Sequence, residues 1–332
     1  MTGAAIFGCG GPALAPSEAA FFAEARPWGF ILFARNVESP AQLRRLTAAL
    51  REAVGREAPI FVDQEGGRVQ RLGPPDWRAW PPPLDYARAA GVGAARAMYL
   101  RYRLIADELR AVGIDGNCAP CADVAAPETH PFLRNRCYGE TAAEVAPLGR
   151  SVAEGLLDGG VLPVLKHLPG HGRATADSHL ALPRVSASLA ELEAVDFAAF
   201  RALADLPLAM TAHVVYEALD PERPATLSPP AIRAIREEIG FGGLLMGDDI
   251  SMGALSGPLA ERAAASIAAG CDVVLHCNGD LAEMEVVAAA AGPLSKVAEA
   301  RAEAALAWRR SPRPFDPEAA EVELAALALV HG

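Results

Sequence analysis

Eight short apolar segments recur along the whole chain, and each is followed by a longer stretch whose apolar residues return with a helical period. The segments are Ala4–Phe7, Gly29–Phe33, Ile60–Asp63, Gly116–Ala119, Leu162–Lys166, Leu208–Thr211, Leu244–Gly247 and Val273–His276. They are apolar on both faces, which is typical of strands buried in a parallel sheet. Eight strand–helix units predict an α/β fold, a single-domain (β/α)8 TIM barrel.

Three of the stretches between these segments carry helix signals at their ends. Residues 39–55 begin with Ser-Pro, continue with leucines at helical spacing and end in glycine. Residues 228–240 repeat that pattern with isoleucines. Residues 188–204 begin with serine, and their sequence predicts a helix with an apolar stripe that starts at Leu189. An open doubly wound sheet is the alternative, but the first segment is followed by GCGGPALAP and not by a G-x-G-x-x-G phosphate loop.

The length of 332 residues suits one large barrel, and no linker-like run divides residues 1–332. A net charge of −11 argues against nucleic acid or an anionic membrane as the main partner. No run of about 18 apolar residues predicts a membrane span, and the first residues lack the pattern of a signal peptide. We therefore expect a cytoplasmic protein. We also expect a monomer or a weak homodimer, although none of these patterns fixes the oligomeric state.

The six cysteines are expected to be reduced thiols in that compartment. Cys118 and Cys121 form a C-x-x-C pair, which can mark a redox or zinc site. A zinc site needs a second pair of ligands, and the spacing of Cys271 and Cys277 does not match a standard one. The favoured interpretation is ordinary buried cysteines.

Polar residues stand where several of the predicted strands end. In a barrel of this kind the carboxyl ends of the strands meet on one rim, where the active site is built. The residues concerned are Asp63, Asp123, Lys166, His167, Thr211, His213, Asp248, Asp249 and His276. Their coincidence on one rim predicts a polar site there.

Asp248 and Asp249 follow the apolar run GGLLMG. Consecutive residues of a strand point to opposite sides, so only one of the two is expected to face the barrel mouth. We predict that Asp248 is a nucleophile or metal ligand, and that Asp249 caps a following helix. A purely structural role for the pair is the alternative.

Residues 166–179 read KHLPGHGRATADSH and hold three histidines. Asp177 lies two residues before His179, a spacing that lets the carboxylate orient the imidazole and favour its protonated form. Such a pair predicts a general acid/base, with a solvated loop as the alternative. His167, His171 and His179 could instead bind a metal, but the chain has neither H-E-x-x-H nor an H-x-H on the first strand.

The same stretch resembles the K-H-[FL]-P-G-H-G-x(4)-D-S-H signature of family-3 glycoside hydrolases, in their bacterial β-N-acetylglucosaminidase branch. GFILFARN, VDQEGGRVQRL, NCAPCADV, RNRCYGE and LLMGDDISMGAL resemble further family segments in the expected order, over about residues 28–255. The resemblance implies retaining hydrolysis, without metal or other cofactor, of terminal β-linked N-acetylglucosamine. The implied substrate is N-acetylglucosamine linked to 1,6-anhydro-N-acetylmuramic acid, with or without a peptide, in cell-wall recycling.

The resemblance also implies a role for individual residues. Asp248 matches the nucleophile, His179 the acid/base, and Asp177 the partner of that histidine. The positions that hold the sugar correspond to Asp63, Arg71, Arg136, Lys166 and His167. The acid/base would be delivered by a mobile loop of about residues 168–182, whose glycines around His171 provide backbone freedom.

The chain departs from the family pattern where NCAPCADV and RNRCYGE carry Cys118, Cys121 and Cys137. These segments adjoin expected sugar contacts, so the leaving group that the pocket prefers stays open. Three alternative functions also stay open: an N-acetylglucosaminide phosphorylase, a metal-dependent barrel hydrolase, and a sugar-binding barrel without catalysis.

Overall fold

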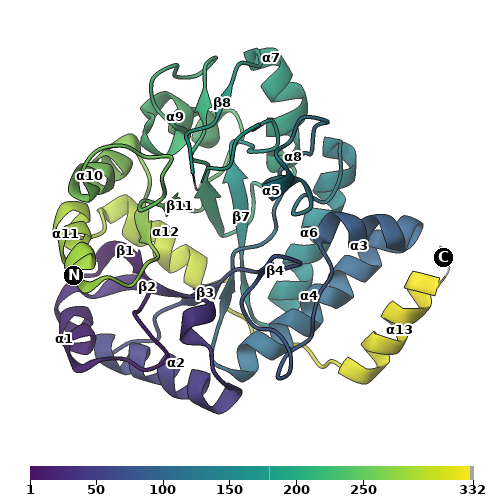
Figure 1. Ribbon diagram of the computed structural model, residues 1–332, viewed down its shortest axis with the longest axis horizontal. Coiled ribbons are helices and arrows are strands. Elements are labelled where there is room, and N and C mark those ends of the chain that lie inside the picture. The colour runs from purple at the N-terminus through teal and green to yellow at the C-terminus, as the bar shows by residue number, and fades with distance from the viewer. Residues whose placement is uncertain (179, 330–332) are drawn as a thin grey trace.

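The structure, a computed structural model, describes residues 1–178 and 180–329. Eight parallel strands close into a barrel in the order β1-β12-β11-β9-β7-β6-β3-β2 (Figure 1). They are β1 (Gly3–Phe7), β2 (Pro27–Leu32), β3 (Ile60–Val62), β6 (Gly116–Asn117), β7 (Leu162–Leu168), β9 (Leu208–Thr211), β11 (Leu244–Asp249) and β12 (Val273–His276). All eight predicted strands are present, and the predicted (β/α)8 fold is confirmed.

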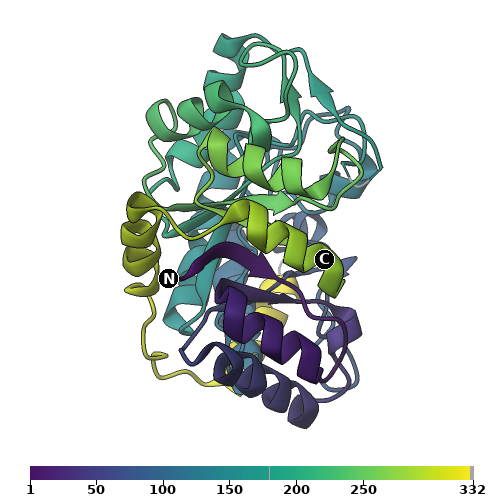
Figure 2. The ribbon, with the colours of Figure 1, turned by 90° about the vertical axis from the view of Figure 1, so that its left-hand side faces the viewer.

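The barrel closes between its first and last strands. Ala5, Ile6 and Phe7 of β1 pair in parallel with Val274, Leu275 and His276 of β12. Figure 2 shows the purple β1 in the middle of the molecule beside the yellow-green helices that follow β12. This pairing leaves no free sheet edge in the barrel. The strands can be apolar on both faces because side chains fill the barrel and helices cover its outside.

The helices surround the barrel (Figure 1). They are α1 (Pro16–Ala25), α2 (Pro40–Val54), α3 (Pro83–Ala90), α4 (Ala94–Ala111), α5 (Pro131–Arg134), α6 (Ala142–Asp158), α7 (Leu189–Glu191), α8 (Phe197–Arg201), α9 (Pro229–Glu237), α10 (Leu259–Ala269), α11 (Leu281–Ala291), α12 (Lys296–Leu306) and α13 (Pro317–Leu329). Single short turns add η1 (Ala34–Asn36), η2 (Gly91–Gly93), the π-turn η3 (Leu192–Asp196) and η4 (Ala225–Leu227). None of the described helices is long and apolar enough to cross a membrane.

The predicted helix signals act as expected at α2 and α9. The Ser39 hydroxyl accepts a hydrogen bond from the Gln42 N–H at the start of α2, and Gly55 ends the helix with a positive φ of 64°. The Ser228 hydroxyl accepts from the Ala231 N–H at the start of α9. Here α9 ends at Glu237, three residues before Gly240.

The stretch 188–204 differs from the regular helix that its sequence predicts. It consists of α7, η3 and α8, and the π-turn of η3 adds a residue to one turn. That extra residue brings Leu192 and Phe197 to the same buried side although they are five positions apart. The prediction for Leu189 was wrong, because its side chain is 41% exposed.

Two small sheets lie beyond the carboxyl ends of the barrel strands. The hairpin of β4 (Gln64–Gly66) and β5 (Val69–Gln70) follows β3 directly. The parallel pair of β8 (Arg184–Val185) and β10 (Val215–Tyr216) follows β7 and β9. These additions build up one rim of the barrel into walls, which is where a barrel enzyme carries its site.

Candidate active site

A cavity of about 600 Å³ opens at the carboxyl ends of the barrel strands. Six of the eight site residues predicted from the sequence line it: Asp63, Arg71, Arg136, Lys166, His167 and Asp248. Asp177 is not among the lining residues, and the predicted acid/base His179 lies outside the described residues. The barrel therefore brings together side chains from β7, β11 and the loops after β3 and β6.

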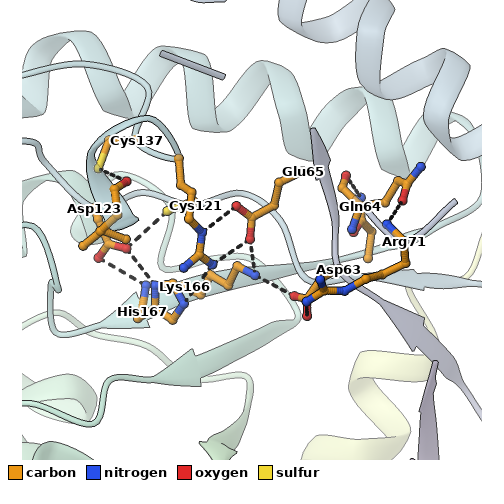
Figure 3. Close-up of polar contacts among 12 residues, drawn as sticks. Asp63, Gln64, Glu65, Arg71, Cys121, Asp123, Cys137, Lys166 and His167 are labelled. Carbon is orange, nitrogen blue, oxygen red and sulfur yellow. Dashed lines mark hydrogen bonds and ion pairs between the residues drawn. The ribbon is translucent and has the colours of Figure 1, made fainter. Parts of the chain in front are cut away.

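A chain of alternating charges forms the floor of this cavity (Figure 3). The Lys166 ammonium lies 2.9 Å from Asp63 Oδ1 and 2.5 Å from Glu65 Oε1. Arg136 donates two hydrogen bonds of 2.8 Å to the two oxygens of Glu65. Arg71 Nη2 lies 3.2 Å from Asp63 Oδ2 at the outer end. Each cation is thus held in a fixed position by at least one carboxylate.

The same contacts fix the charge states. Burial alone would raise the pKa of Asp63, but the Lys166 and Arg71 charges hold it well below its usual range. Burial would likewise raise the pKa of Glu65, but the charges of Arg136 and Lys166 lower it to about 2. Burial opposes the charge of Lys166, but Asp63 and Glu65 raise the pKa of its ammonium well above the usual value. The floor therefore stays ionised across the neutral range.

Glu65 is a site residue to which the sequence analysis gave no role. Its side chain is 0% exposed, and it links Lys166 to Arg136. The signal was available, because Glu65 lies two residues after Asp63 in VDQEGG and alternate residues of an extended chain share a side. Asn117 fixes this extended segment, since its side chain exchanges two 3.0 Å hydrogen bonds with the Gln64 backbone.

His167 is held from behind by Asp123. The His167 Nδ1–H donates to Asp123 Oδ2 over 2.7 Å, and Asp123 Oδ1 accepts from the backbone N–H groups of His167 and His171. Arg136 Nη2 approaches His167 Nε2 at 3.5 Å from the other side. A guanidinium can only donate, so Nε2 is the acceptor of this weak contact. Asp123 thus sets the tautomer and the orientation of the ring.

Cys121 completes a buried group of three possible metal ligands. The ligand atoms of Cys121, Asp123 and His167 lie within 4.8 Å of one another. However, the Cys121 thiol donates to Asp123 over 3.2 Å, and a hydrogen bond with Cys137 together with burial raises its pKa well above the usual value. A metal binds the thiolate, which this setting disfavours. All six cysteines are buried and free, as predicted from the sequence.

Asp248 and Asp249 both line the cavity, so the expectation that only one would face the mouth was wrong. The pairing of β11 with β12 shifts register between Met246 and Asp249. Such an irregularity breaks strict alternation and redirects side chains. The pairing of β7 with β9 shifts in the same way between Leu165 and Leu168, and both Lys166 and His167 reach the cavity.

The prediction that Asp249 caps a helix was also wrong, because Asp249 caps a turn. Its carboxylate accepts hydrogen bonds from the N–H and hydroxyl of Ser251 and from the Cys277 N–H. The chain after it forms turns, and α10 begins only at Leu259. Asp249 is therefore a cap for a turn and ties β11 to the end of β12.

The charge of Asp248 is stabilised by basic groups and by the backbone. Burial would raise its pKa, but His213, His167, the Asp249 N–H and Lys166 together hold the pKa below its usual value. The Asp249 N–H donates to Asp248 Oδ1 over 2.8 Å, whereas Oδ2 makes no hydrogen bond within residues 1–178 and 180–329.

Four residues of the predicted rim do not line the cavity: Asp123, which lies behind His167, and Thr211, His213 and His276. Thr211 bonds to Thr226 over 2.7 Å, and the His276 Nε2 lies 3.0 Å from Glu283. His213 donates from Nε2 to the Asp249 carbonyl over 2.9 Å. His213 thus supports the strand that carries Asp248, whereas Thr211 and His276 belong to the packing around the barrel.

The segment after β7 is fixed on the rim as far as Ala174. Gly172 lies so close to Val124 that a Cβ atom would come within 1.8 Å of the Val124 carbonyl oxygen. The Thr129 hydroxyl donates to the Gly172 carbonyl, and the Ala174 carbonyl accepts from the His130 N–H over 2.9 Å. The glycine that the sequence associates with backbone freedom thus also serves a close contact.

Ser178 returns the segment to the cavity wall. Its hydroxyl lies 3.2 Å from His171 Nε2, and its carbonyl accepts from the Ala254 N–H over 3.2 Å. Asp177 is half-buried, and its carbonyl accepts from the N–H groups of Leu180 and Ala181. These contacts place the backbone of residues 177–178 beside the cavity.

His171 predicts a measurable pH dependence of stability. Burial, followed by repulsion from His167, lowers its pKa to about 4, whereas a histidine in the unfolded chain titrates near 6.5. The unfolded state binds this proton more readily, so stability is full above about pH 6.5 and falls as the pH drops toward 4. From pH 7 to pH 5 the free energy of unfolding should fall by about 2 kcal/mol more in the wild type than in His171→Gln. Urea unfolding at both pH values measures this difference, and equal falls in the two proteins would contradict it.

Comparison with known proteins gives a consistent result. The model of the glycosyl hydrolase family 3 N-terminal domain matches residues 17–308. A β-hexosaminidase of Alkalilimnicola ehrlichii is 40% identical over 286 residues, which cover 84% of this chain and 81% of that protein.

Two solved structures extend the similarity to the fold. A family 3 β-N-acetylglucosaminidase from Paenibacillus sp. FPU-7 aligns with a TM-score of 0.87 and 28% identity, covering 98% of this chain and 67% of that one. NagZ from Neisseria gonorrhoeae, in complex with N-trifluoroacetyl-D-glucosamine, aligns with a TM-score of 0.84 and 30% identity, covering 99% and 97% of the two chains.

Proposed function

The chain belongs to glycoside hydrolase family 3 and has the β-N-acetylglucosaminidase activity of its relatives, and from this premise we propose how its cavity performs the reaction. The observation that carries the proposal is the meeting of Asp248 with the charged floor of Asp63, Lys166 and Arg136 in one cavity. Among the described residues the Asp248 carboxylate makes no ion pair and can attack, while Asp63, Lys166 and Arg136 are paired within the floor and can hold a sugar.

We assign the sugar-binding role to the floor. Asp63 can accept hydrogen bonds from sugar hydroxyls, while Lys166, Arg136 and Arg71 can donate to hydroxyl or amide oxygens. Because Glu65 and Asp63 already fix these cations, little side-chain entropy is lost when the sugar binds. His167 presents Nε2 to the cavity and is kept in place by Asp123.

Asp248 is the proposed nucleophile. Its Oδ2 attacks the anomeric carbon, the bond from that carbon to the leaving oxygen breaks, and a covalent glycosyl-enzyme forms. The lowered pKa of Asp248 keeps the carboxylate ionised for this attack. The negative charge also stabilises the oxocarbenium-like transition state before the bond is complete.

His179 is the proposed general acid/base, and Asp177 is its partner. His179 gives its proton to the leaving oxygen in the first step and takes a proton from the attacking water in the second. The support is the sequence pattern, together with the position of Ser178 in the cavity wall. Since residues 169–174 are fixed on the rim, we propose that the predicted loop movement of residues 168–182 takes place mainly beyond Ala174.

The finer proposal concerns the substrate. We propose that the natural substrate is N-acetylglucosamine β-linked to 1,6-anhydro-N-acetylmuramic acid, with or without its peptide, and that the protein acts in cell-wall recycling. We further propose a cytoplasmic location and a monomer or weak homodimer, which fractionation and size-exclusion chromatography can test.

Turnover of two substrates tests this function. The purified protein should release N-acetylglucosamine from 4-nitrophenyl N-acetyl-β-glucosaminide and from the anhydro-disaccharide, with or without phosphate or a chelator. A sugar 1-phosphate formed in the presence of phosphate would establish a phosphorylase instead. Loss of activity with chelator and its recovery with zinc would favour a metal-dependent hydrolase, and no turnover of either substrate would favour a binding protein.

A further inference from the structure

Positive charge gathers in the cavity of a chain whose formal net charge is −11. Three carboxylates line the cavity, and Glu65 in its floor makes a fourth, against five basic side chains. The basic residues are Arg35, Arg68, Arg71, Arg136 and Lys166. A positive pocket in an acidic protein concentrates anionic ligands over neutral ones.

Four of these cations are already engaged. Arg71, Arg136 and Lys166 belong to the ionised floor described above, and Arg35 donates to two backbone carbonyl groups. Within residues 1–178 and 180–329, Arg68 is the basic residue of the cavity that makes no hydrogen bond or ion pair. Its five N–H donors are thus available to a ligand.

Arg68 is nevertheless held in place. The carbon at the centre of its guanidinium lies 3.6 Å from the centre of the Phe132 ring, which is a close cation–π contact. Arg68 stands at the turn between β4 and β5, directly after two glycines with positive φ angles of 109° and 58°. The tight turn and the ring together aim a preorganised planar donor group at the cavity.

The position of Arg68 is on the side where the leaving group must depart. Phe132, on which Arg68 stacks, lies in α5, and the N–H of His130 at the start of that helix donates to the Ala174 carbonyl over 2.9 Å, so Arg68 lies beside the segment that leads to Asp177. The proposed acid/base follows Asp177 in the chain and has to reach the leaving oxygen. Arg68 and the leaving group therefore share one side of the cavity.

We propose that Arg68, stacked on Phe132, determines leaving-group specificity by binding a carboxylate carried by the leaving sugar. This inference rests on the proposed hydrolysis of an N-acetylglucosaminide and names the chemistry of the leaving group. A lactyl carboxylate on a muramic acid residue has the planar two-oxygen geometry that a guanidinium binds with two parallel hydrogen bonds. A leaving group without that charge leaves Arg68 without a partner, and this includes a muramic acid whose lactyl carboxyl is joined to a peptide as an amide. The contact therefore applies to the peptide-free substrate.

The test compares two leaving groups that differ only in charge. The substrates are the N-acetylglucosaminyl-anhydromuramic disaccharide with a free lactyl carboxylate and its lactyl methyl ester. The wild type should have a kcat/KM about tenfold to hundredfold higher for the acid than for the ester, the range expected of a charge-assisted hydrogen bond. Arg68→Gln should bring that ratio close to one, mainly through the acid, and Arg68→Lys should keep part of it.

A matched variant controls for net charge. Arg88→Gln removes one positive charge from an exposed ion pair with Glu140 outside this cavity, and it should keep the wild-type ratio. A wild-type ratio near one, or a ratio that survives in Arg68→Gln, overturns the role of Arg68 while the glycosidase activity stands. If the wild type cleaves neither disaccharide nor 4-nitrophenyl N-acetyl-β-glucosaminide, the proposed function is wrong and this inference fails with it.

Discussion

Replacement of Asp248 by alanine should lower kcat/KM for 4-nitrophenyl N-acetyl-β-glucosaminide by at least about 10⁴-fold, the scale of loss when a catalytic nucleophile is removed. The leaving group of this substrate departs readily, so protonation cannot limit the reaction and the loss reports on the attack itself. Circular dichroism and urea unfolding should show a folded variant, because Asp248 accepts one backbone hydrogen bond and makes no ion pair with any residue that the structure describes.

Azide separates loss of the nucleophile from other causes. In Asp248→Ala, azide can enter the space of the missing carboxylate and should yield the α-glycosyl azide, the product of one inverting attack. His179→Ala with azide should yield the β-glycosyl azide, because azide then attacks the glycosyl-enzyme in place of water. Asp249→Asn is the neighbouring control, and a loss as large as that of Asp248→Ala without azide rescue in either would contradict the assignment.

Replacement of Glu65 by glutamine should cost about 3–5 kcal/mol of unfolding free energy, the range for removing one partner of a buried ion pair. Glu65 is fully buried, and its loss leaves the charges of Arg136 and Lys166 without the carboxylate that links them. Urea unfolding measures the loss. The variant should also show a raised KM, because the cations that hold the sugar are no longer fixed.

Glu323 provides a control with the same chemistry and different burial. It binds Arg96 with two hydrogen bonds of 2.8 and 2.9 Å, but the side chains of Arg96 and Glu323 are 51% and 42% exposed. Glu323→Gln should therefore cost less than about 1 kcal/mol. A cost for Glu65→Gln as small as that of Glu323→Gln would show that the buried network does not stabilise the fold.

The barrel could be predicted because its signal is repeated eight times. Each strand is an apolar segment followed by a helical pattern. A wrong assignment in one of these units would not have changed the predicted fold class. The sequence predicted the helices less accurately than the strands, as residues 188–204 illustrate. A π-turn there allowed apolar residues five positions apart to be buried together, which a strict helical period does not anticipate.

The site could be predicted as a set of residues but not as a geometry. The strand ends and the family motif identified Asp63, Lys166, His167 and Asp248, all of which line one cavity. The register shifts of β7 and β11 could not be predicted, because they arise from pairing with neighbouring strands. They decide which neighbours along a strand reach the cavity together.

Two further residues show what a one-dimensional pattern omits. Glu65 matters because two cations from distant parts of the chain meet on its carboxylate. Arg68 stands out only when the partners of the other four cavity cations are known. The spacing of Glu65 from Asp63 signalled that the two share a side, but the partners of Glu65 and of Arg68 are set by contacts between elements that the chain order alone does not contain.

The central claim is that Asp248 forms a covalent bond to the sugar during turnover. A 5-fluoro N-acetylglucosaminyl fluoride forms the glycosyl-enzyme quickly and releases it slowly, so the intact protein should gain the mass of one 5-fluoro sugar. Peptide mass spectrometry should place that mass on Asp248, and Asp248→Ala should not be labelled. An inactivated enzyme with the label on another residue, or full turnover of the inhibitor without any labelled protein, would contradict the mechanism.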